Sequence, residues 1–275
     1  MMKYAFGDAR DVLERASARE TAARVGAGGV CRLLLAEFGI RVISHVVMLG
    51  GIAAETKELD FDDISRLTDP ATSPLRCADK KAEKKMCALI DSMREKGDTL
   101  GGEIEVLAEN VPPGLGSYVQ WDKRLDGAFA RALMSIQAVK AVSIGEGIEN
   151  AGRKGSEVHD PIGYNGPEKS FFRLSNRSGG LEGGVTNGAT LRLRAFMKPI
   201  ATLSSPLETV DIESKKRSSA ATERSDVSAV AACGIVAEAV TAIEIASALT
   251  DKFGGDSVAE MKRNYSAYIE SLKEI

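Results

Sequence analysis

The sequence contains only two histidines and four cysteines, and the small number and spacing of the cysteines exclude two classes of protein. Its four cysteines, Cys31, Cys77, Cys87 and Cys233, show no CxxC spacing among 275 residues, so neither a disulfide framework nor a zinc ribbon is predicted. The first residues also lack a charged region followed by an apolar run and a cleavage site, which is the pattern of a secretory signal. We therefore expect a reduced, cytoplasmic protein.

The sequence has no large excess of charge of one sign. Its 36 basic and 39 acidic residues give a formal net charge of -3, so we expect no general attraction to nucleic acid or to an anionic membrane surface. One apolar segment, Val227 to Leu249, has the length of a membrane span, but polar residues recur along it at every third position. This narrow polar stripe favours a helix buried in a protein core. The stripe consists of Glu238, Thr241, Glu244 and Ser247.

Apolar periodicity predicts helices and strands without regular alternation of the two. The composition, 44% hydrophobic and 27% charged, is ordinary for a globular protein, and we expect a single domain over residues 1–275. Because no βαβ repeat is visible, we predict the α+β class and not a doubly wound parallel sheet. The predicted helices are Asp8–Phe38, Asp62–Leu67, Lys80–Lys96, Lys123–Ser135 and Val258–Leu272, and the predicted strands are Ile40–Met48, Glu103–Ala108, Ala138–Ile144 and Ala189–Met197.

Two phrases of the sequence resemble each other. AEFGIRVISHVVMLGGI and ALMSIQAVKAVSIGEGI both predict a helix, a strand and a glycine turn that ends in isoleucine, which indicates an internal duplication. The residues that follow the second phrase, from Glu146 to Ser178, show no sustained periodicity. A loop of this length in a compact chain usually carries function or is disordered.

The segment ERASARE, Glu14 to Glu20, has the spacing of a capping box. Ser17 would cap a helix while Glu20 reaches back to it. A helix N-terminus beside Arg15 and Arg19 would suit a phosphate group. A capped helix with solvated arginines remains the alternative from these residues alone.

A glycine-rich loop precedes a strand with basic side chains on one face. Glycines at 179, 180, 183, 184 and 188 would allow backbone to approach a ligand closely, although the loop fits neither the P-loop nor the dinucleotide fingerprint. Arg192, Arg194 and Lys198 alternate with apolar residues along the strand and so share one face. A hairpin loop and solvated edge charges are the alternatives.

Arg224, Ser225 and Asp226 stand immediately before the long apolar helix. An aspartate there is usually an N-cap, whose carboxylate accepts hydrogen bonds from backbone amides and has a lowered pKa as a result. The residues alone therefore leave capping and proton transfer as two roles for Asp226.

Three of these segments together resemble one family. ERASARE, the stretch RSGGLEGGVTNGATLRLRAFMKPIATLSSPLETVD at Arg177–Asp211, and ERSDVSAV at Glu223–Val230 resemble chorismate synthase, and the resemblance runs from Lys3 to the C-terminal helix. It implies a layered sandwich of helices between antiparallel sheets and a homotetramer. The implied reaction is a 1,4-elimination of phosphate from 5-enolpyruvylshikimate 3-phosphate that yields chorismate, the last step of the shikimate pathway, with reduced FMN as cofactor and NADPH as a candidate reductant.

The same resemblance implies roles for particular residues. Asp226 would relay a proton, and Arg19 and Arg224 would bind the substrate. No metal site is implied. The implied flavin-binding residues are Arg15, Ala16, Ser17, Gln137, Ala138, Gly183, Lys198, Pro199, Ile200, Ala201, Thr202 and Arg224.

Neither histidine matches the two catalytic histidines that the resemblance implies. His45 lies in an apolar strand and His159 in the loop VHDP, whereas the family carries its catalytic histidines, with several arginines that bind the substrate, in a segment before the equivalent of Lys3. We therefore expect a chain that is truncated at the N-terminus relative to the family and inactive alone. The alternative function is a non-catalytic remnant that folds and binds flavin without eliminating phosphate.

Overall fold

The structure is a computed structural model that describes residues 2–8, 11–12, 16–220, 222 and 225–275. Its helices are α2 Thr21–Ala36, α3 Phe61–Leu67, α4 Lys80–Lys96, α5 Leu125–Met134, α6 Gly147–Asn150, α7 Gly155–Val158, α8 Val230–Phe253 and α9 Val258–Ser271. The 3-10 helices are η1 Met2–Tyr4, η2 Ala18–Glu20, η3 Trp121–Lys123 and η4 Leu272–Glu274. The strands are β1 Arg41–Leu49, β2 Ile52–Ala53, β3 Gly102–Glu109, β4 Val139–Ile144, β5 Ile162–Asn165, β6 Ser170–Arg173, β7 Leu181–Glu182, β8 Val185–Thr186, β9 Leu191–Met197, β10 Glu208–Val210 and β11 Arg217–Ser219.

A five-stranded antiparallel sheet organises the described part of the chain. Its strand order is β2-β1-β3-β9-β4, and every adjacent pair is antiparallel, so the α+β prediction is confirmed. Three two-stranded ribbons, β5–β6, β7–β8 and β10–β11, complete the described strands. The first and the last of these ribbons lie in segments for which the sequence predicted no strands.

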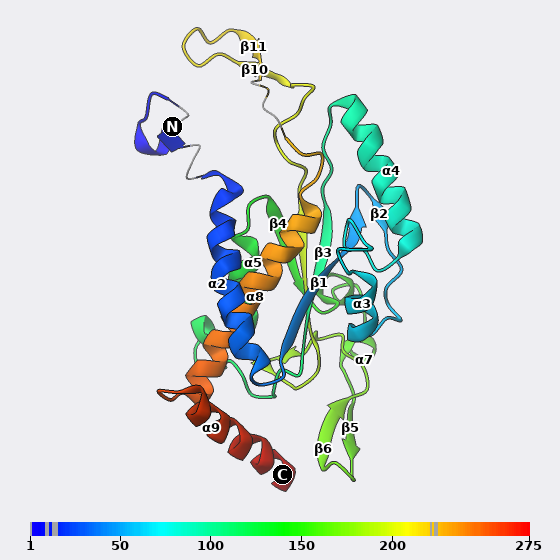
Figure 1. Ribbon diagram of the computed structural model, residues 1–275, viewed down its shortest axis with the longest axis vertical. Coiled ribbons are helices and arrows are strands. Elements are labelled where there is room, and N and C mark those ends of the chain that lie inside the picture. The colour runs from blue at the N-terminus through cyan, green and yellow to red at the C-terminus, as the bar shows by residue number, and fades with distance from the viewer. Residues whose placement is uncertain (1, 9–10, 13–15, 221, 223–224) are drawn as a thin grey trace.

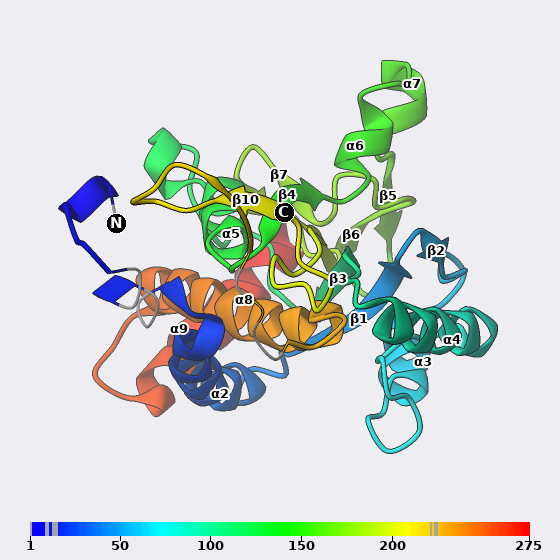
Figure 2. The same ribbon diagram turned by 90° about the horizontal axis from the view of Figure 1, so that it is seen from above.

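A layer of three helices covers one face of the sheet. Helix α8 crosses the middle of this face, with α2 and α5 packed on either side of it, while α3 lies on the opposite face (Figures 1 and 2). A Cβ atom on Gly28 would come within 2.5 Å of the Ala239 Cα atom, so α2 and α8 can approach this closely only because that residue is glycine. The core between the layers contains Leu35, Ile104, Phe129, Leu193, Ile245 and Leu249.

The two similar phrases occupy related places in this arrangement. One forms α2 followed by β1 and the other α5 followed by β4. Strands β1 and β4 flank the central pair β3–β9, and α2 and α5 flank α8 (Figure 2). This placement supports the predicted internal duplication.

Helix α8 is the apolar segment that the sequence placed in the core. Its 24 residues are long and apolar enough to cross a membrane, but most of the helix is buried within the fold. The residues of the predicted polar stripe lie in two different environments. Glu238 and Thr241 are buried, while Glu244 and Ser247 line a cavity on the side of α5. The core prediction for this helix is therefore confirmed.

The carboxylate of Glu238 connects several elements within the core. Its Oε1 atom accepts hydrogen bonds from the Ser44 amide and hydroxyl, each at 2.8 Å, and from the guanidinium of Arg76. Its Oε2 atom pairs with Arg32 Nη1 at 2.8 Å. One buried side chain of α8 thus fixes β1, α2 and the loop before α4.

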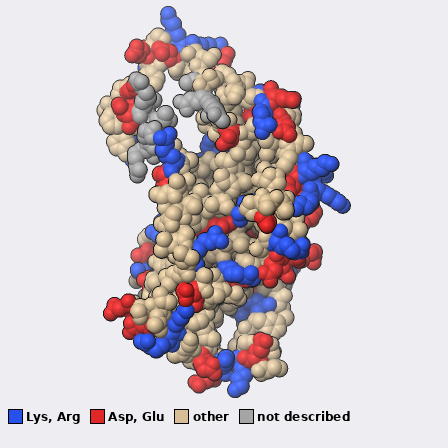
Figure 3. All heavy atoms as spheres, in the orientation of Figure 1, with Lys and Arg blue, Asp and Glu red and all other residues tan. Residues whose placement is uncertain are grey.

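Charged side chains are mixed over the surface. Figure 3 shows basic and acidic residues interspersed on the visible face, in agreement with the small net charge. Any anion-binding site must therefore depend on local groups and not on the field of the whole molecule.

We predict that Glu238→Ala lowers the free energy of unfolding by about 3 kcal/mol, because it leaves the largely buried guanidinium of Arg76 without its carboxylate. Urea denaturation would measure the change. Glu37→Ala is the control, since Glu37 pairs with Lys262 at the exposed surface, and it should cause no measurable loss. Equal effects of the two substitutions would contradict this account of the core.

Candidate functional site

Three of the segments predicted to bind flavin meet at one end of the sheet, where β9 finishes and β4 begins. The Lys198 amide donates a hydrogen bond to the Ala138 carbonyl at 2.9 Å. The neighbouring side chain, Gln137, donates from Nε2 to Glu20 Oε1 at 2.7 Å. Two hydrogen bonds therefore connect the KPIAT turn, the SIQAVK segment and the ERASARE segment, which are far apart in the sequence.

The ERASARE segment forms a short helical turn that leads into α2. Ser17 is the N-cap of η2, and its hydroxyl accepts a hydrogen bond from the Arg19 amide at 3.3 Å. Arg24 reinforces the contact with the SIQAVK segment by donating to the Ser135 hydroxyl at 2.7 Å. Ala16 and Arg19 are exposed at this end of the molecule. Arg15 and Arg224, which the sequence also predicted for the site, lie outside the described residues.

Asp226 faces the KPIAT turn across a narrow crevice. The crevice, of about 50 Å³, is lined by Thr99, Thr202 and Asp226 among others. Pockets that enclose a ligand usually measure about 300–1,000 Å³, so this crevice is too small to enclose one by itself. Pro199, Ile200 and Ala201 form the turn between Lys198 and Thr202.

The structure does not support a capping role for Asp226. Helix α8 begins at Val230, its N-cap is Ala229, and the nearest hydroxyl acceptor for its first amide is Ser228. The Asp226 side chain is exposed and has no hydrogen bond or ion pair with another described residue. Its carboxylate is therefore available to a ligand.

Gln137 and Ala138 show two features that suit a bound flavin. Gln137 Oε1 is buried and accepts no hydrogen bond from any described residue, and a flavin ring carries an N–H group that could donate to it. Ala138 has a φ of +67°, a conformation that is strained for alanine and occurs often at ligand-binding sites. The residues present at this end therefore fit the predicted cofactor.

Gly183 is not brought to this end of the sheet. It lies in the turn between β7 and β8, where the Gly184 carbonyl accepts a hydrogen bond from the Leu125 amide at the start of α5. Gln137 follows the other end of this ten-residue helix, which is about 15 Å long.

The basic strand serves the fold. As predicted, Arg192 and Arg194 share a face of β9, but both donate to the buried carboxylate of Glu105 at 3.0 Å. His45 Nε2 lies 3.1 Å from the same carboxylate. Burial acts to raise the pKa of Glu105, but the hydrogen bond with His45 and the charge of Arg192 hold it well below its usual value. These side chains satisfy one another and leave Lys198 as the exposed cation of the predicted three.

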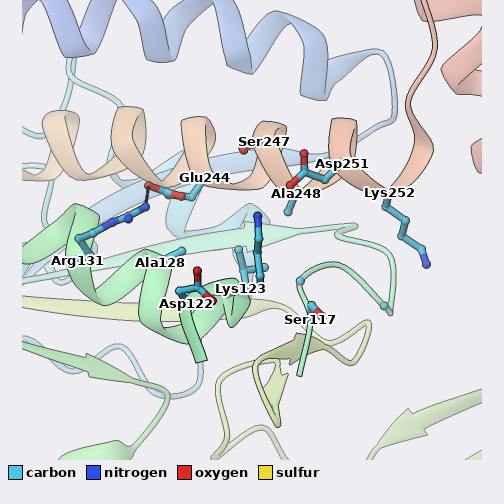
Figure 4. A pocket seen from close by; sticks show the side chains of 13 residues that line it. Ser117, Asp122, Lys123, Ala128, Arg131, Glu244, Ser247, Ala248, Asp251 and Lys252 are labelled. Carbon is cyan, nitrogen blue, oxygen red and sulfur yellow. Dashed lines mark ion pairs between the residues drawn. The ribbon is translucent and has the colours of Figure 1, made fainter. Parts of the chain in front are cut away.

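A separate cavity of about 400 Å³ lies between α5, α8 and the loop before α5. Figure 4 shows Arg131 of α5 directed toward Glu244 of α8, at 3.8 Å, with Asp122 and Lys123 nearby. Burial raises the pKa of the Glu244 carboxyl, while Arg131 acts to lower it. None of the described residues predicted for the flavin site lines this cavity.

Comparison with known proteins identifies the family. The family model described as chorismate synthase matches residues 1–250. The chain belongs to the chorismate synthase family. A relative named chorismate synthase from Geobacter metallireducens is 52% identical over 278 residues, covering 99% of this chain and 70% of the relative. The corresponding protein of Brevibacillus brevis is 52% identical, with 98% and 70% covered.

A solved structure gives the same result for the fold. A crystal structure of chorismate synthase superposes with a TM-score of 0.85 and 42% sequence identity, covering 100% of this chain and 75% of that one. The sequence resemblance to chorismate synthase, carried by ERASARE, the glycine-rich stretch and ERSDVSAV, is therefore confirmed. The same match confirms the predicted fold class.

We predict that Asp160 stabilises the fold in a pH-dependent way, because it binds the segment before the glycine-rich loop. Its carboxylate accepts hydrogen bonds from the amides of Arg177 and Ser178, each at 2.9 Å. Burial acts to raise the pKa of Asp160, but hydrogen bonds from Ser175, Arg177 and Ser178 lower it to about 2. Because the folded pKa lies below the unfolded value of about 3.9, the stabilisation is complete above pH 4 and is lost as the pH falls through 2.

Asp160→Asn should therefore lower the free energy of unfolding by about 1 kcal/mol at pH 7, since the side chain is partly exposed. The difference from the unsubstituted chain should shrink between pH 4 and pH 2. Urea denaturation at a series of pH values would test this, and a difference that did not change with pH would contradict it.

Proposed function

We propose that this chain contributes the flavin- and phosphate-binding side of a chorismate synthase active site. The reaction is the 1,4-elimination of phosphate from 5-enolpyruvylshikimate 3-phosphate to give chorismate, which makes the protein a carbon–oxygen lyase of the shikimate pathway. Membership of the family supports the activity. The observation in the fold that supports the site is the meeting of Ser17–Glu20, Gln137–Ala138 and Lys198–Thr202 at one end of the sheet.

The chemistry requires more than a side-chain base. The hydrogen to be removed is not adjacent to a carbonyl, so its C–H bond is only weakly acidic. Reduced FMN, with NADPH as a candidate reductant, would supply transient electron donation while phosphate leaves. The residues of this chain then have to hold the cofactor and substrate, neutralise phosphate and move a proton.

The exposed charges at this end of the molecule suit those tasks. Lys198 and the amides of the following turn provide positive charge and hydrogen-bond donors for an anionic ligand. Arg19 is exposed beside the capped turn at Ser17, and we propose that it binds the substrate phosphate. Asp226, which is not used as a cap, is the candidate for proton transfer.

The remaining assignments follow from family membership. We propose a single domain over residues 1–275, a cytoplasmic location and a homotetramer. Arg15 and Arg224 keep their predicted roles in flavin and substrate binding. Gly183 joins the flavin site only if a ligand or a second subunit bridges the distance to Gln137.

A second candidate function, for the isolated chain, is flavin binding without catalysis, and it rests on the positions of the two histidines. The sequence contains only His45 and His159. His45 is buried against Glu105 on the sheet face opposite α8, and His159 is exposed in the loop after α7. Neither lies among the residues that line the crevice at Asp226.

We therefore predict that the 275-residue chain binds FMN but releases phosphate no faster than a protein-free control. Binding would be followed by flavin fluorescence, and turnover by phosphate release under anaerobic conditions with reduced FMN and 5-enolpyruvylshikimate 3-phosphate. A chimera that adds the unmatched part of the Geobacter metallireducens relative should restore turnover. Rapid release by the 275-residue chain alone would show that its own residues carry every proton-transfer step, and a silent chimera would refute the lyase proposal.

Asp226→Asn in this chimera should reduce kcat by about 100-fold or more, the usual scale for an acid–base group, because it keeps the shape of the side chain and removes the titratable carboxyl. Flavin affinity should change little. Asp98→Asn is the matched control, since Asp98 lines the same crevice and has no proposed part in proton transfer. An unchanged kcat in Asp226→Asn would remove Asp226 from the mechanism.

A further inference from the structure

The linker between α4 and β3, residues Gly97 to Gly101, contacts every segment around the crevice. It contains five residues, Gly-Asp-Thr-Leu-Gly, and begins with Gly97, the C-cap of α4. The family resemblance assigned no role to it. We refer to it as the α4–β3 linker.

Two adjacent residues of the linker hold the two sides of the crevice. Thr99 is largely buried, with 8% of its surface exposed, and its hydroxyl donates to the Ile200 carbonyl in the KPIAT turn at 2.7 Å. The Leu100 amide donates to the carbonyl of Val227, the residue after Asp226, at 2.7 Å. A single peptide unit therefore sets the distance between the KPIAT turn and Asp226.

The glycines at the two ends of the linker allow it to approach these segments. Gly97 has a φ of +69°, and a Cβ atom there would lie 2.8 Å from the Ser205 amide nitrogen. A Cβ atom on Gly101 would lie 2.4 Å from the Met197 carbonyl oxygen. The Gly97 carbonyl also accepts a hydrogen bond from the Ser205 amide at 3.1 Å, so the two ends of the linker contact residues that flank the KPIAT turn.

The hydroxyl of Thr99 is the only side-chain group of the linker that holds the turn among the described residues. Asp98 uses its carboxylate within the linker, accepting from the Thr99 amide at 2.7 Å. The Ile200 carbonyl, in a partly buried position, would lose its donor if the Thr99 hydroxyl were removed, and an unpaired carbonyl shielded from water is costly. The turn would then relax toward water, and its amides and Lys198 would move with it.

We propose that Thr99 is a positioning residue for the candidate site: its hydroxyl fixes the KPIAT turn at the correct distance from Asp226. This inference rests on the proposed function for its consequence in flavin binding, but its structural content is independent. It extends the site to a segment that contacts the binding residues without contacting the cofactor.

The test compares Thr99→Val, which keeps the shape and removes the hydroxyl, with Thr99→Ser, which restores it. Thr68→Val is the matched control, because Thr68 is also buried and its hydroxyl donates to the Ile64 carbonyl at the same distance, 2.7 Å, at the end of α3. All three variants are made in the 275-residue chain. Hydrogen–deuterium exchange of the peptides covering residues 198–205 and 225–230 is measured together with FMN affinity.

Thr99→Val should raise exchange in both peptides and weaken FMN binding by about 10-fold, which corresponds to one lost hydrogen bond. Thr99→Ser should restore both values, and Thr68→Val should leave both unchanged while raising exchange around α3. Loss of thermal stability in Thr99→Val with no change in either peptide would overturn the proposal. If the unsubstituted chain failed to bind FMN, the proposed flavin site would be refuted, and the exchange data would still decide the role of Thr99.

Discussion

The rest of this structure depends on a buried carboxylate, that of Glu238 on α8. A charge inside a protein core must be paired and hydrogen-bonded, and this one is satisfied only when β1, α2 and the loop carrying Arg76 all come to it. The requirement fixes where α8 crosses the sheet. Because the segment with Asp226 leads directly into α8, the position of that candidate proton carrier is set by a polar contact deep in the core.

The opposite face of the sheet is organised around a second buried carboxylate, that of Glu105. Arg192, Arg194 and His45 all contact it. The two arginines of the basic strand therefore neutralise a carboxylate inside the protein and are not directed to a ligand. Lys198 lies beyond the end of β9 and escapes this pairing. Of the three basic side chains predicted on one face, the one that remains exposed therefore lies at the end of the sheet, where the candidate site lies.

Local patterns predicted the elements whose signals lie within a few residues. Helix α4 was predicted with its observed bounds, since Asp79 caps its start and Gly97 ends it in the left-handed conformation. The hairpin β5–β6 was missed because its glycines and exposed aromatic residues break the alternation expected of strands. The residues at the site came from family resemblance, and no local pattern indicated the contacts that hold them. Thr99 and Ile200 are 101 positions apart, and Glu20 and Gln137 are 117 apart.

The two related helix–strand units show how the site departs from the pattern that surrounds it. Each connection contains one residue with positive φ: Gly39 between α2 and β1, and Ala138 between α5 and β4. Glycine adopts this conformation without strain, whereas alanine does so at a cost of about 1 kcal/mol or more. The strained residue lies in the connection that contains Gln137, and its own carbonyl accepts a hydrogen bond from the Lys198 amide. Glycine at position 138 would relieve the strain, but it would also make the backbone more flexible beside Gln137 Oε1, which is buried and has no hydrogen-bond partner among the described residues. Alanine at this position is therefore consistent with a backbone that is preorganised for a ligand.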